Sequence, residues 1–253
     1  MSESEISLEF YERLTPTCTL EKNNFSIKFY TPTVNIKALV DTMFVAEPET
    51  IEWIGGFKKG EIFLDIGANI GLYSLWAAVS RGVRCFSFEP ESLNFSILNR
   101  NIFYNNLVKK VTAYPLAVSD QIGFDFLHLS VFESGESCHS YGSNKNFAHE
   151  EFVPAFSQGS FSTTIDHLVE TSIIPAPNHI KIDVDGIENK IINGSRKILE
   201  RPELKSMVIE INDDLPCDSE VKEILKSLGF ILTSAPPSVL APVKSVHNII
   251  CRR

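Results

Sequence analysis

Four residues at alternate positions, Asp65, Gly67, Asn69 and Gly71, have the types and spacing of a nucleotide-binding turn. The glycines allow a sharp turn and leave room for a ligand beside the main chain. A dinucleotide fingerprint would read G-x-G-x-x-G and hold a pyrophosphate on backbone amides. Here one glycine is missing, and the preceding carboxylate would repel a pyrophosphate. S-adenosyl-L-methionine carries a sulfonium and an ammonium group and no phosphate, so the spacing favours that ligand. The alternative is a purely structural turn in which Asp65 caps the next helix.

A second carboxylate, Glu89, ends the apolar run Val83–Phe88, about 20 residues beyond the turn. Nucleotide-binding units place a carboxylate at this distance on the ribose hydroxyls. Pro90 suits the first position of a helix, so Glu89 also fits the residue that precedes one. The two interpretations are compatible, and we predict ribose binding.

Further acids follow or lie within later strands, where they could serve a methyl-transfer reaction. An alcohol that accepts a methyl group must be held in line with it and must lose a proton, which a nearby carboxylate or histidine would assist. Ligands of open α/β sheets bind outside the carboxyl ends of the strands. This indicates Asp183, Asp185 and Glu210 as candidate catalytic residues, with Asn212 beside them.

Each of these acids has a structural alternative. Asp183, the preferred base or substrate-positioning acid, could instead form an ion pair with a lysine such as Lys181. Asp185 and Glu188 have the spacing of a capping pair at a helix start. Glu210 lies in an apolar strand, where an unpaired charge is costly, so it needs a partner or a role.

The elements that must position these residues alternate between strands and helices from Glu61 onward. This alternation predicts an α/β fold with a doubly wound parallel sheet. The predicted strands are Ile62–Ile66, Val83–Phe88, Val111–Leu116, His179–Val184, Met207–Ile211, Phe230–Leu232 and Val246–Cys251. The predicted helices are Leu72–Gly82, Glu91–Asn105, Gly186–Leu199 and Ser219–Leu228. The turn-rich connection SAPPSVLAPVK indicates that the final strand runs antiparallel.

Two regions depart from this alternation. Residues 1–59 are predicted to be an N-terminal extension that packs on the core, with strands at Leu8–Tyr11 and Phe25–Tyr30 and two helices, Asn35–Ala46 and Pro48–Phe57. The remaining domain, 60–253, carries an insertion at about 121–167, with extra strands around a polar segment. Long loops inside compact domains are usually functional lids or disordered tips, and we predict a substrate-covering lid.

The composition is that of an ordinary globular protein, with 43% hydrophobic and 22% charged residues among 253. A formal net charge of -9 argues against nucleic acid as the main partner, because phosphate binding needs clustered lysine and arginine. The acidic start MSESEISLEF is unlike a secretory signal, and no apolar run approaches the roughly 20 residues that span a bilayer. We therefore expect a cytoplasmic protein.

Metal and cysteine chemistry are not indicated. The five cysteines are scattered without a C-x-x-C pair, so neither a zinc site nor a disulfide framework is predicted. Acids at several strand ends would also allow a divalent metal held by oxygens, but no His-plus-acid spacing supports one, and we predict none. His139 and His149, in the presumed lid, are candidate bases, although solvated side chains are the commoner case.

Several segments resemble the FkbM-type S-adenosylmethionine-dependent methyltransferases. They are EPETIEWI, FLDIGANIGLYSL, FEP, NRNIFYNNL, PLAVSD, TTIDHL, IKIDVDGIENKIINGSRKIL and VIEIN, and they span most of residues 47–212. Family members usually have glutamate at the position of Asp185, so this chain has one methylene less of reach there.

The resemblance implies a class I methyltransferase, Rossmann-like fold with seven strands, the last antiparallel. It also implies O-methyl transfer to a hydroxyl of a sugar, glycan or natural product, and the N-terminal phrases resemble a branch associated with polysaccharide biosynthesis. The residues implied for S-adenosyl-L-methionine are Asp65, Gly67, Ala68, Asn69 and Gly71 at the methionine part, Glu89 at the ribose, and Ala117 and Val118 beside adenine. The alternatives are a nicotinamide-dependent oxidoreductase and a non-catalytic nucleotide-binding module. The sequence leaves the oligomeric state open.

Overall fold

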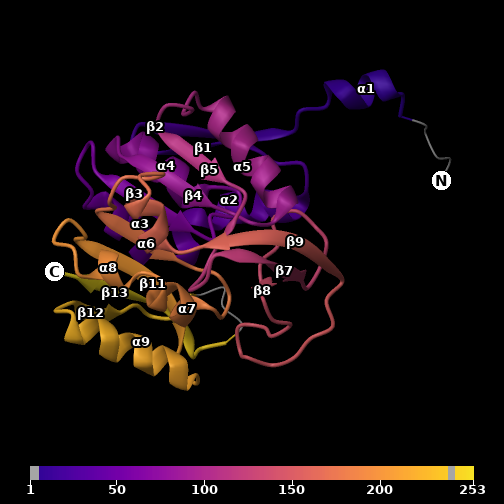
Figure 1. Ribbon diagram of the computed structural model, residues 1–253. Helices are drawn as coiled ribbons and strands as arrows, with labels where there is room; N and C mark the ends of the chain where they lie inside the picture. The colour runs from indigo at the N-terminus through magenta and orange to yellow at the C-terminus, as the bar shows by residue number, and fades with distance from the viewer. Residues whose placement is uncertain (1–5, 239–242) are drawn as a thin grey trace.

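A seven-stranded sheet forms the centre of the protein, whose computed structural model describes residues 6–238 and 243–253 (Figure 1). The strand order is β12-β13-β11-β10-β3-β4-β5. The strands are β3 (Ile62–Ile66), β4 (Arg84–Phe88), β5 (Val111–Tyr114), β10 (His179–Ile182), β11 (Ser206–Asn212), β12 (Ile231–Ser234) and β13 (Val246–Arg252). The pairs from β11 to β5 are parallel, whereas β13 is antiparallel to both of its neighbours. The predicted α/β sheet of seven strands with the last antiparallel is therefore confirmed.

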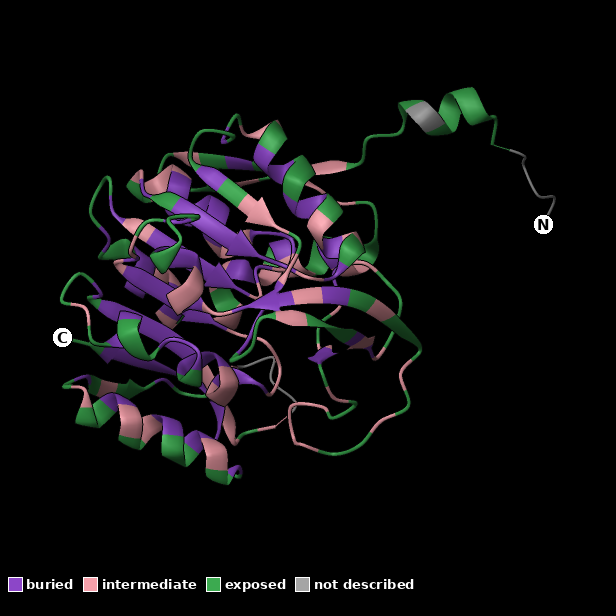
Figure 2. Cartoon of the chain, viewed as in Figure 1, coloured by how far each residue is buried: buried purple, intermediate pink, exposed green. Residues whose placement is uncertain are grey.

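Helices cover both faces of this sheet because its central strands bury apolar side chains on both sides. The helices are α2 (Val34–Ala46), α3 (Pro48–Gly55), α4 (Leu72–Arg81), α5 (Ser92–Tyr104), α6 (Ile165–Glu170), α7 (Glu188–Asn193), α8 (Arg196–Leu199) and α9 (Pro216–Ser227). Phe63 faces the cluster formed with α2 to α5, while Leu64 and Ile66 face the cluster formed with α6 to α9. The buried residues accordingly concentrate in the central strands and on the inner sides of the helices (Figure 2).

The N-terminal segment contributes to the first of these clusters. Its hairpin, β1 (Thr17–Lys22) and β2 (Phe25–Tyr30), buries Ile27 and Phe29 there, and α2 adds Ile36. The strand predicted at Phe25–Tyr30 is confirmed. The strand predicted at Leu8–Tyr11 is wrong, because the segment forms helix α1 (Leu8–Arg13), which stands clear of the body (Figure 1).

A local side-chain contact explains the helix at this position. The hydroxyl of Ser7 accepts a hydrogen bond from the backbone N–H of Phe10, as an N-cap does. Glu9 and Arg13, four residues apart, also form an ion pair on its surface. Residues 1–5 of the predicted N-terminal extension lie outside the described residues, and the division at residue 59 stays a prediction.

A second, four-stranded sheet occupies the region predicted as an insertion. Its order is β6-β9-β7-β8, and the strands are β6 (Ala117–Val118), β7 (Gly123–Leu129), β8 (Ser140–Tyr141) and β9 (Phe156–Thr163). In Figure 1 it lies beside the carboxyl ends of the central parallel strands. The insertion is therefore placed where the ligand of an open α/β sheet is expected.

The predicted helix Gly186–Leu199 is interrupted, so this prediction is wrong in its extent. Helix α7 ends at Asn193 and α8 starts at Arg196. Gly194, between them, lies so close to the next segment that a Cβ there would be 2.3 Å from the carbonyl oxygen of Ser119. The close approach of two backbones requires a glycine here, and the chain bends around it.

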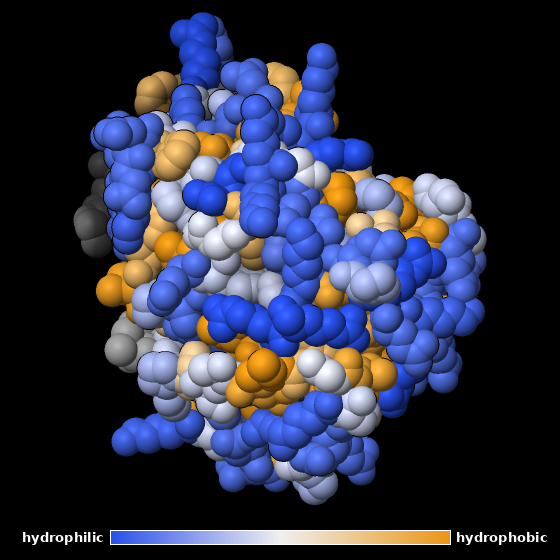
Figure 3. Space-filling model, turned by 90° about the vertical axis from the view of Figure 1, so that its left-hand side faces the viewer, coloured by the Kyte–Doolittle hydropathy of each residue, from blue (hydrophilic) through white to orange (hydrophobic). Residues whose placement is uncertain are grey.

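The amino ends of the parallel strands form the opposite edge of the sheet. Figure 3 shows this face, where hydrophilic side chains predominate around a narrow apolar strip. In the described parts of the chain, every helix is too short or too polar to cross a lipid bilayer. The predicted turn-rich connection before the last strand includes residues 239–242, which lie outside the described residues.

Candidate active site

The glycine turn after β3 packs tightly against the ends of two neighbouring strands. The backbone N–H groups of Gly67 and Ala68 both donate to the carbonyl oxygen of Phe88, at 3.0 Å. Gly67 has a φ of +81°, and a Cβ on it would lie 1.8 Å from the carbonyl oxygen of Asp183. Glycine is therefore required at this position both for its conformation and for the space.

A cavity opens beside this turn at the carboxyl ends of β3, β4 and β10. Its empty volume, including its opening to solvent, is about 710 Å³. The residues of the turn that line it are Gly67 and Asn69, whereas Asp65, Ala68 and Gly71 do not. Ala117 and Val118, predicted beside adenine, form part of the wall.

The carboxyl group of Asp65 lies behind the turn, and it faces helix α4. Asp65 is 1% exposed and accepts a hydrogen bond of 2.6 Å from the hydroxyl of Ser74, which also contacts the hydroxyl of Ser87. Burial raises the pKa of Asp65, and the nearby charge of Lys181 lowers it. The carboxylate is thus turned toward α4 and does not line the cavity. A contact between Asp65 and the cofactor stays a prediction.

Glu89 lies at the end of β4, where two backbone groups fix its carboxylate. It accepts hydrogen bonds from the N–H of Asn69 at 2.7 Å and from that of Glu91 at 2.8 Å. Burial raises the pKa of Glu89 to about 8, against the lowering effect of these two N–H groups. The structure thus brings Glu89 and the glycine turn together on one cavity wall, as the spacing of about 20 residues predicts.

Asn69 presents an unsatisfied acceptor at the same wall. Its side-chain N–H group donates to the carbonyl oxygen of Glu136 at 3.2 Å, while its Oδ1 is shielded from solvent and has no partner. Its φ of +48° is uncommon for a residue other than glycine, although asparagine tolerates it. A buried acceptor without a donor is costly, so a ligand with a donor group would stabilise this site.

Asp183 lines the cavity, and its carboxylate forms an ion pair with a lysine, the structural alternative to a catalytic role. The partner is Lys181, a β10 residue that is 1% exposed. Lys181 also lies 3.7 Å from Glu47, at the junction of α2 and α3. The pKa of Lys181 is raised, because the attraction of Asp183, Glu47 and Asp65 outweighs its burial. One buried cation thus links the strand end to the N-terminal helices.

Asp185 lines the cavity and holds the insertion in place. Its carboxylate accepts a hydrogen bond of 2.8 Å from the backbone N–H of Cys138. The interpretation of Asp185 as a helix cap is wrong, because Ile187 is the N-cap residue of α7 and provides no side-chain bond. Burial, followed by the charge of Asp183, raises the pKa of Asp185 to about 7.

Glu210 lies outside this cavity, in a separate small pocket. Glu188, Asp218 and Phe147 of the insertion also line that pocket. Burial raises the pKa of Glu210 well above the ordinary value, and the charges of Asp183 and Asp185 add to the effect. The structure thus places Asp183 and Asp185 on the cavity wall and Glu210 behind them.

Comparison with known proteins supports a relation to methyltransferases. A family model, the methyltransferase FkbM domain, matches residues 65–232. This chain belongs to the FkbM methyltransferase family. The 31-O-demethyl-FK506 methyltransferase FkbM of Streptomyces tacrolimicus is 25% identical over an alignment of 217 residues, and the match covers 78% of this chain and 82% of that protein.

The fold of this FkbM-family protein is also similar to a solved structure. The crystal structure of methyltransferase FkbM from Methylobacillus flagellatus KT aligns with a TM-score of 0.54 at 16% identity. The alignment covers 87% of this chain and 54% of that chain, so this chain spans about half the length of the crystallised relative. At this identity the likeness supports the class I methyltransferase fold and no more.

One segment of the FkbM-family site contains His139, which the sequence offers as a candidate base. Residues Gly135–His139, which we call the strap, lie between β7 and β8, and Glu136, Ser137 and His139 line the cavity. The side chain of Asn94 binds the strap twice, since it accepts from the N–H of Gly135 at 2.6 Å and donates to the carbonyl oxygen of Glu136 at 3.0 Å. Asparagine at this helix position carries no recognisable sequence signal, because its partner is 41 residues away.

Within the described residues, no group of three histidine, cysteine, aspartate or glutamate side chains is arranged to hold a metal ion. The carboxyl groups around the cavity instead contact backbone N–H groups, Lys181 and the side chain of Asn35.

Proposed function

We propose that this protein is an S-adenosyl-L-methionine-dependent methyltransferase that methylates a hydroxyl group of a sugar, glycan or other natural product. The observation that carries the proposal is the set of carboxyl groups on the cavity wall, which a cation would stabilise in their ionised form. Glu89, Glu136, Asp183 and Asp185 line the cavity, and none of the described lining residues is a lysine or an arginine. A cationic ligand is favoured in such a site, whereas a dinucleotide pyrophosphate would be repelled.

The residues present fit S-adenosyl-L-methionine. The unpaired Oδ1 of Asn69 would accept a hydrogen bond from the ammonium group of the methionine part. The carboxylate of Glu89, fixed by two N–H groups, would accept from the ribose hydroxyls. Ala117 and Val118 would contact adenine through apolar surface. When bound, the cofactor would supply a methyl group activated by a positively charged sulfur.

The protein's own residues would position the acceptor and exclude water. The strap and the second sheet cover the strand ends, so a bound acceptor would be held against the cofactor with little freedom. Such positioning can provide a large part of the rate enhancement of a two-substrate reaction. The choice of oxygen as the methylated atom is supported by the curated relative, whose name describes a 31-O-demethyl substrate.

The acceptor class is part of the same proposal. A small hydroxylated molecule or glycan is favoured over nucleic acid, because the chain has a net charge of -9 and the cavity is lined by carboxyl groups.

Calorimetric titration with S-adenosylhomocysteine, S-adenosylmethionine and NAD tests the cofactor. We expect the first two to bind and NAD not to bind. Glu89→Ala should weaken S-adenosylhomocysteine at least about tenfold, since the ribose hydroxyls would lose their hydrogen-bond acceptor. Glu200→Ala, at an exposed helix end, should leave the affinity unchanged. Binding of NAD alone would refute the proposal.

A screen of sugars, oligosaccharides and macrolides for methyl uptake would identify the acceptor.

A further inference from the structure

His139 is the one titratable side chain of the cavity wall whose polar atoms are all without a partner among the described residues. Both of its ring nitrogens are shielded from solvent and make no hydrogen bond. A buried ring nitrogen loses its bonds to water, so leaving both unpaired is unfavourable unless a ligand satisfies them. The imidazole of His139 is therefore a second unsatisfied group in the same cavity, in addition to the Oδ1 of Asn69.

The other titratable groups of the wall are already engaged. Glu89 accepts from two backbone N–H groups, and Asp185 accepts from the strap. Asp183 is paired with a buried lysine. Glu136 accepts from the side chain of Asn35 at 2.9 Å, and the hydroxyl of Tyr141 donates to the carbonyl oxygen of Gly123 at 3.3 Å. Among these titratable groups, His139 alone has no hydrogen bond or ion pair within the described residues, so a nitrogen of its neutral ring is available for a substrate proton.

The strap gives His139 a defined position. The N–H groups of Cys138 and His139 are both held by the carboxylate of Asp185 at the end of β10. Two residues earlier, the carbonyl oxygen of Glu136 accepts from the side chains of Asn69 and Asn94. The ring of His139 is thus presented to the cavity from a backbone that is tied to the cofactor turn, to α5 and to β10.

We propose that His139 is the proton acceptor in methyl transfer, an inference that rests on the proposed function. The acceptor oxygen forms its bond to the methyl carbon as the carbon–sulfur bond breaks, and the O–H proton passes to the free nitrogen of the imidazole. The cationic sulfur becomes neutral and the imidazole becomes an imidazolium, so atoms and charge balance.

The charge state of the imidazole suits this role. Burial lowers the pKa of His139 below the ordinary 6.5, and the charge of Glu91 at the start of α5 opposes this effect. The ring is therefore neutral at pH 7, as a base must be. The charged groups that line the same cavity are Glu136 on the strap, Glu89 after β4, and Asp183 and Asp185 after β10.

Two inert ligands test the inference without knowledge of the acceptor. Sinefungin has an amine in the place of the methyl group, whereas S-adenosylhomocysteine has nothing there. If His139 faces the transferred group, His139→Ala should weaken sinefungin about tenfold and leave S-adenosylhomocysteine within twofold. His139→Gln, which restores a hydrogen-bond acceptor, should recover part of the loss. His128→Ala, in β7 outside the cavity, is the matched control and should change neither affinity.

The pH dependence separates this role from a structural one. Because burial holds the pKa of His139 below 6.5, the imidazolium forms only as the pH falls further below that value. It would then repel the amine of sinefungin, so the preference of the wild type for sinefungin over S-adenosylhomocysteine should fall. His139→Ala should show no such step, although Glu89 and Asp185 still titrate in both proteins. Equal loss of both ligands in His139→Ala, or no loss of either, would overturn the inference. Failure of the wild type to bind S-adenosylhomocysteine would instead overturn the proposed function.

Discussion

At the scale of single residues, the cavity is shaped by side chains that bind backbone groups of other segments. Glu89 holds the turn that contains Asn69, Asn94 holds the strap, and Asp185 holds the strap from the opposite side. Each of these bonds joins two segments that are far apart in the sequence. These polar contacts therefore join distant segments of the wall, whose apolar residues, such as Ile66 and Phe88, belong to the buried core.

The close contact at Gly67 leads to a prediction. Gly67→Ala would put a Cβ 1.8 Å from a carbonyl oxygen in a left-handed conformation. The turn or the end of β10 would have to move, so we expect a loss of about 2–4 kcal/mol in the free energy of unfolding and loss of S-adenosylhomocysteine binding. Urea denaturation and calorimetry measure the two effects.

Gly55→Ala is the matched control for this variant. Gly55 ends helix α3, and a Cβ there would meet nothing within 4 Å. Its effect should be neutral or stabilising by up to about 1 kcal/mol. Equal effects of the two substitutions would show that the contact at Gly67 is relieved at little cost.

Spacing in the sequence predicts the positions of the cavity residues better than their directions. The turn at Gly67 and the carboxylate of Glu89 lie on one wall because both follow strands of the same parallel sheet. The carboxyl group of Asp65 turns away because the hydroxyl of Ser74, nine residues later on α4, is its nearest donor. The sequence offers His139 and His149 as candidate bases but does not distinguish them, because the free nitrogens of His139 depend on contacts of the whole strap.

At the scale of elements, the parallel core could be predicted because its strands are continuous apolar runs and its helices have clear ends. The failures occur where local contacts compete with the pattern. The segment Leu8–Tyr11 is predicted as a strand, but the side chain of Ser7 caps its first turn and favours a helix. The break between α7 and α8 depends on the backbone of Ser119, which approaches Gly194 from a distant part of the chain.

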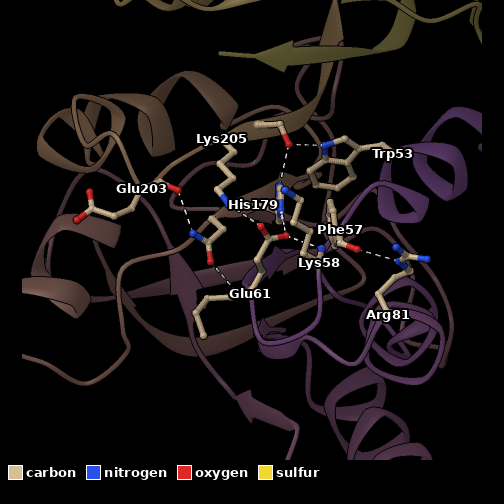
Figure 4. A network of polar contacts seen from close by, with 11 residues as sticks. Trp53, Phe57, Lys58, Glu61, Arg81, His179, Glu203 and Lys205 are labelled. Atoms are coloured by element: carbon tan, nitrogen blue, oxygen red, sulfur yellow. Dashed lines mark hydrogen bonds and ion pairs between the residues drawn. The ribbon is translucent and has the colours of Figure 1, made fainter.

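A polar network connects the elements at the amino ends of the strands (Figure 4). The carboxylate of Glu61 accepts from His179 at 2.9 Å and from Lys205 at 2.6 Å. The other ring nitrogen of His179 is 2.8 Å from the hydroxyl of Ser206, which itself accepts from the indole N–H of Trp53. With Trp53 donating, the hydroxyl donates to a neutral His179, whose second N–H donates to Glu61. The chain of bonds ties helix α3 to β3, β10 and β11.

This network predicts how stability depends on acid. Burial alone would raise the pKa of Glu61, but hydrogen bonds from Lys205, the backbone of Lys58 and His179 lower it to about 2. Because the folded value lies below the ordinary 4.5, the stabilisation is complete above pH 4.5 and is lost as the pH falls toward 2. Glu61→Gln should therefore destabilise by about 2–3 kcal/mol at pH 7 and by almost nothing near pH 2.

Glu203→Gln is the matched control, because the exposed side chain of Glu203 points away from the network in Figure 4. It should change the free energy of unfolding by less than about 0.5 kcal/mol at any pH. Urea denaturation of the three proteins from pH 2 to pH 7 gives the comparison. A difference between the wild type and Glu61→Gln that is constant with pH would contradict the assignment.

At the scale of the whole molecule, the two edges of the sheet have opposite electrostatic character. At the amino edge, Glu61 is stabilised as an anion by neighbouring donors. At the carboxyl edge, buried carboxyl groups crowd together, and burial raises the pKa of Glu89 and Glu188 to about 8 and that of Asp185 to about 7. A cationic ligand at this edge would stabilise the ionised form of these carboxyl groups, which is consistent with the proposed cofactor.

The burial of these carboxyl groups predicts that the ligand-free protein loses stability in alkali. Glu188 is 4% exposed, and its folded pKa of about 8 lies above the ordinary 4.5. The folded state then binds more protons than the unfolded state between these values, so stability falls as the pH rises from 4.5 to 8. In Glu188→Gln the amide oxygen can still accept from the N–H of Gly186. The loss of stability between pH 5 and pH 8.5 should thus be smaller in the variant by roughly 3 kcal/mol.

Glu220→Gln, on the exposed face of α9, is the matched control and should follow the wild type throughout. If the free energy of unfolding changed with pH in the same way in all three proteins, Glu188 would already be ionised at neutral pH.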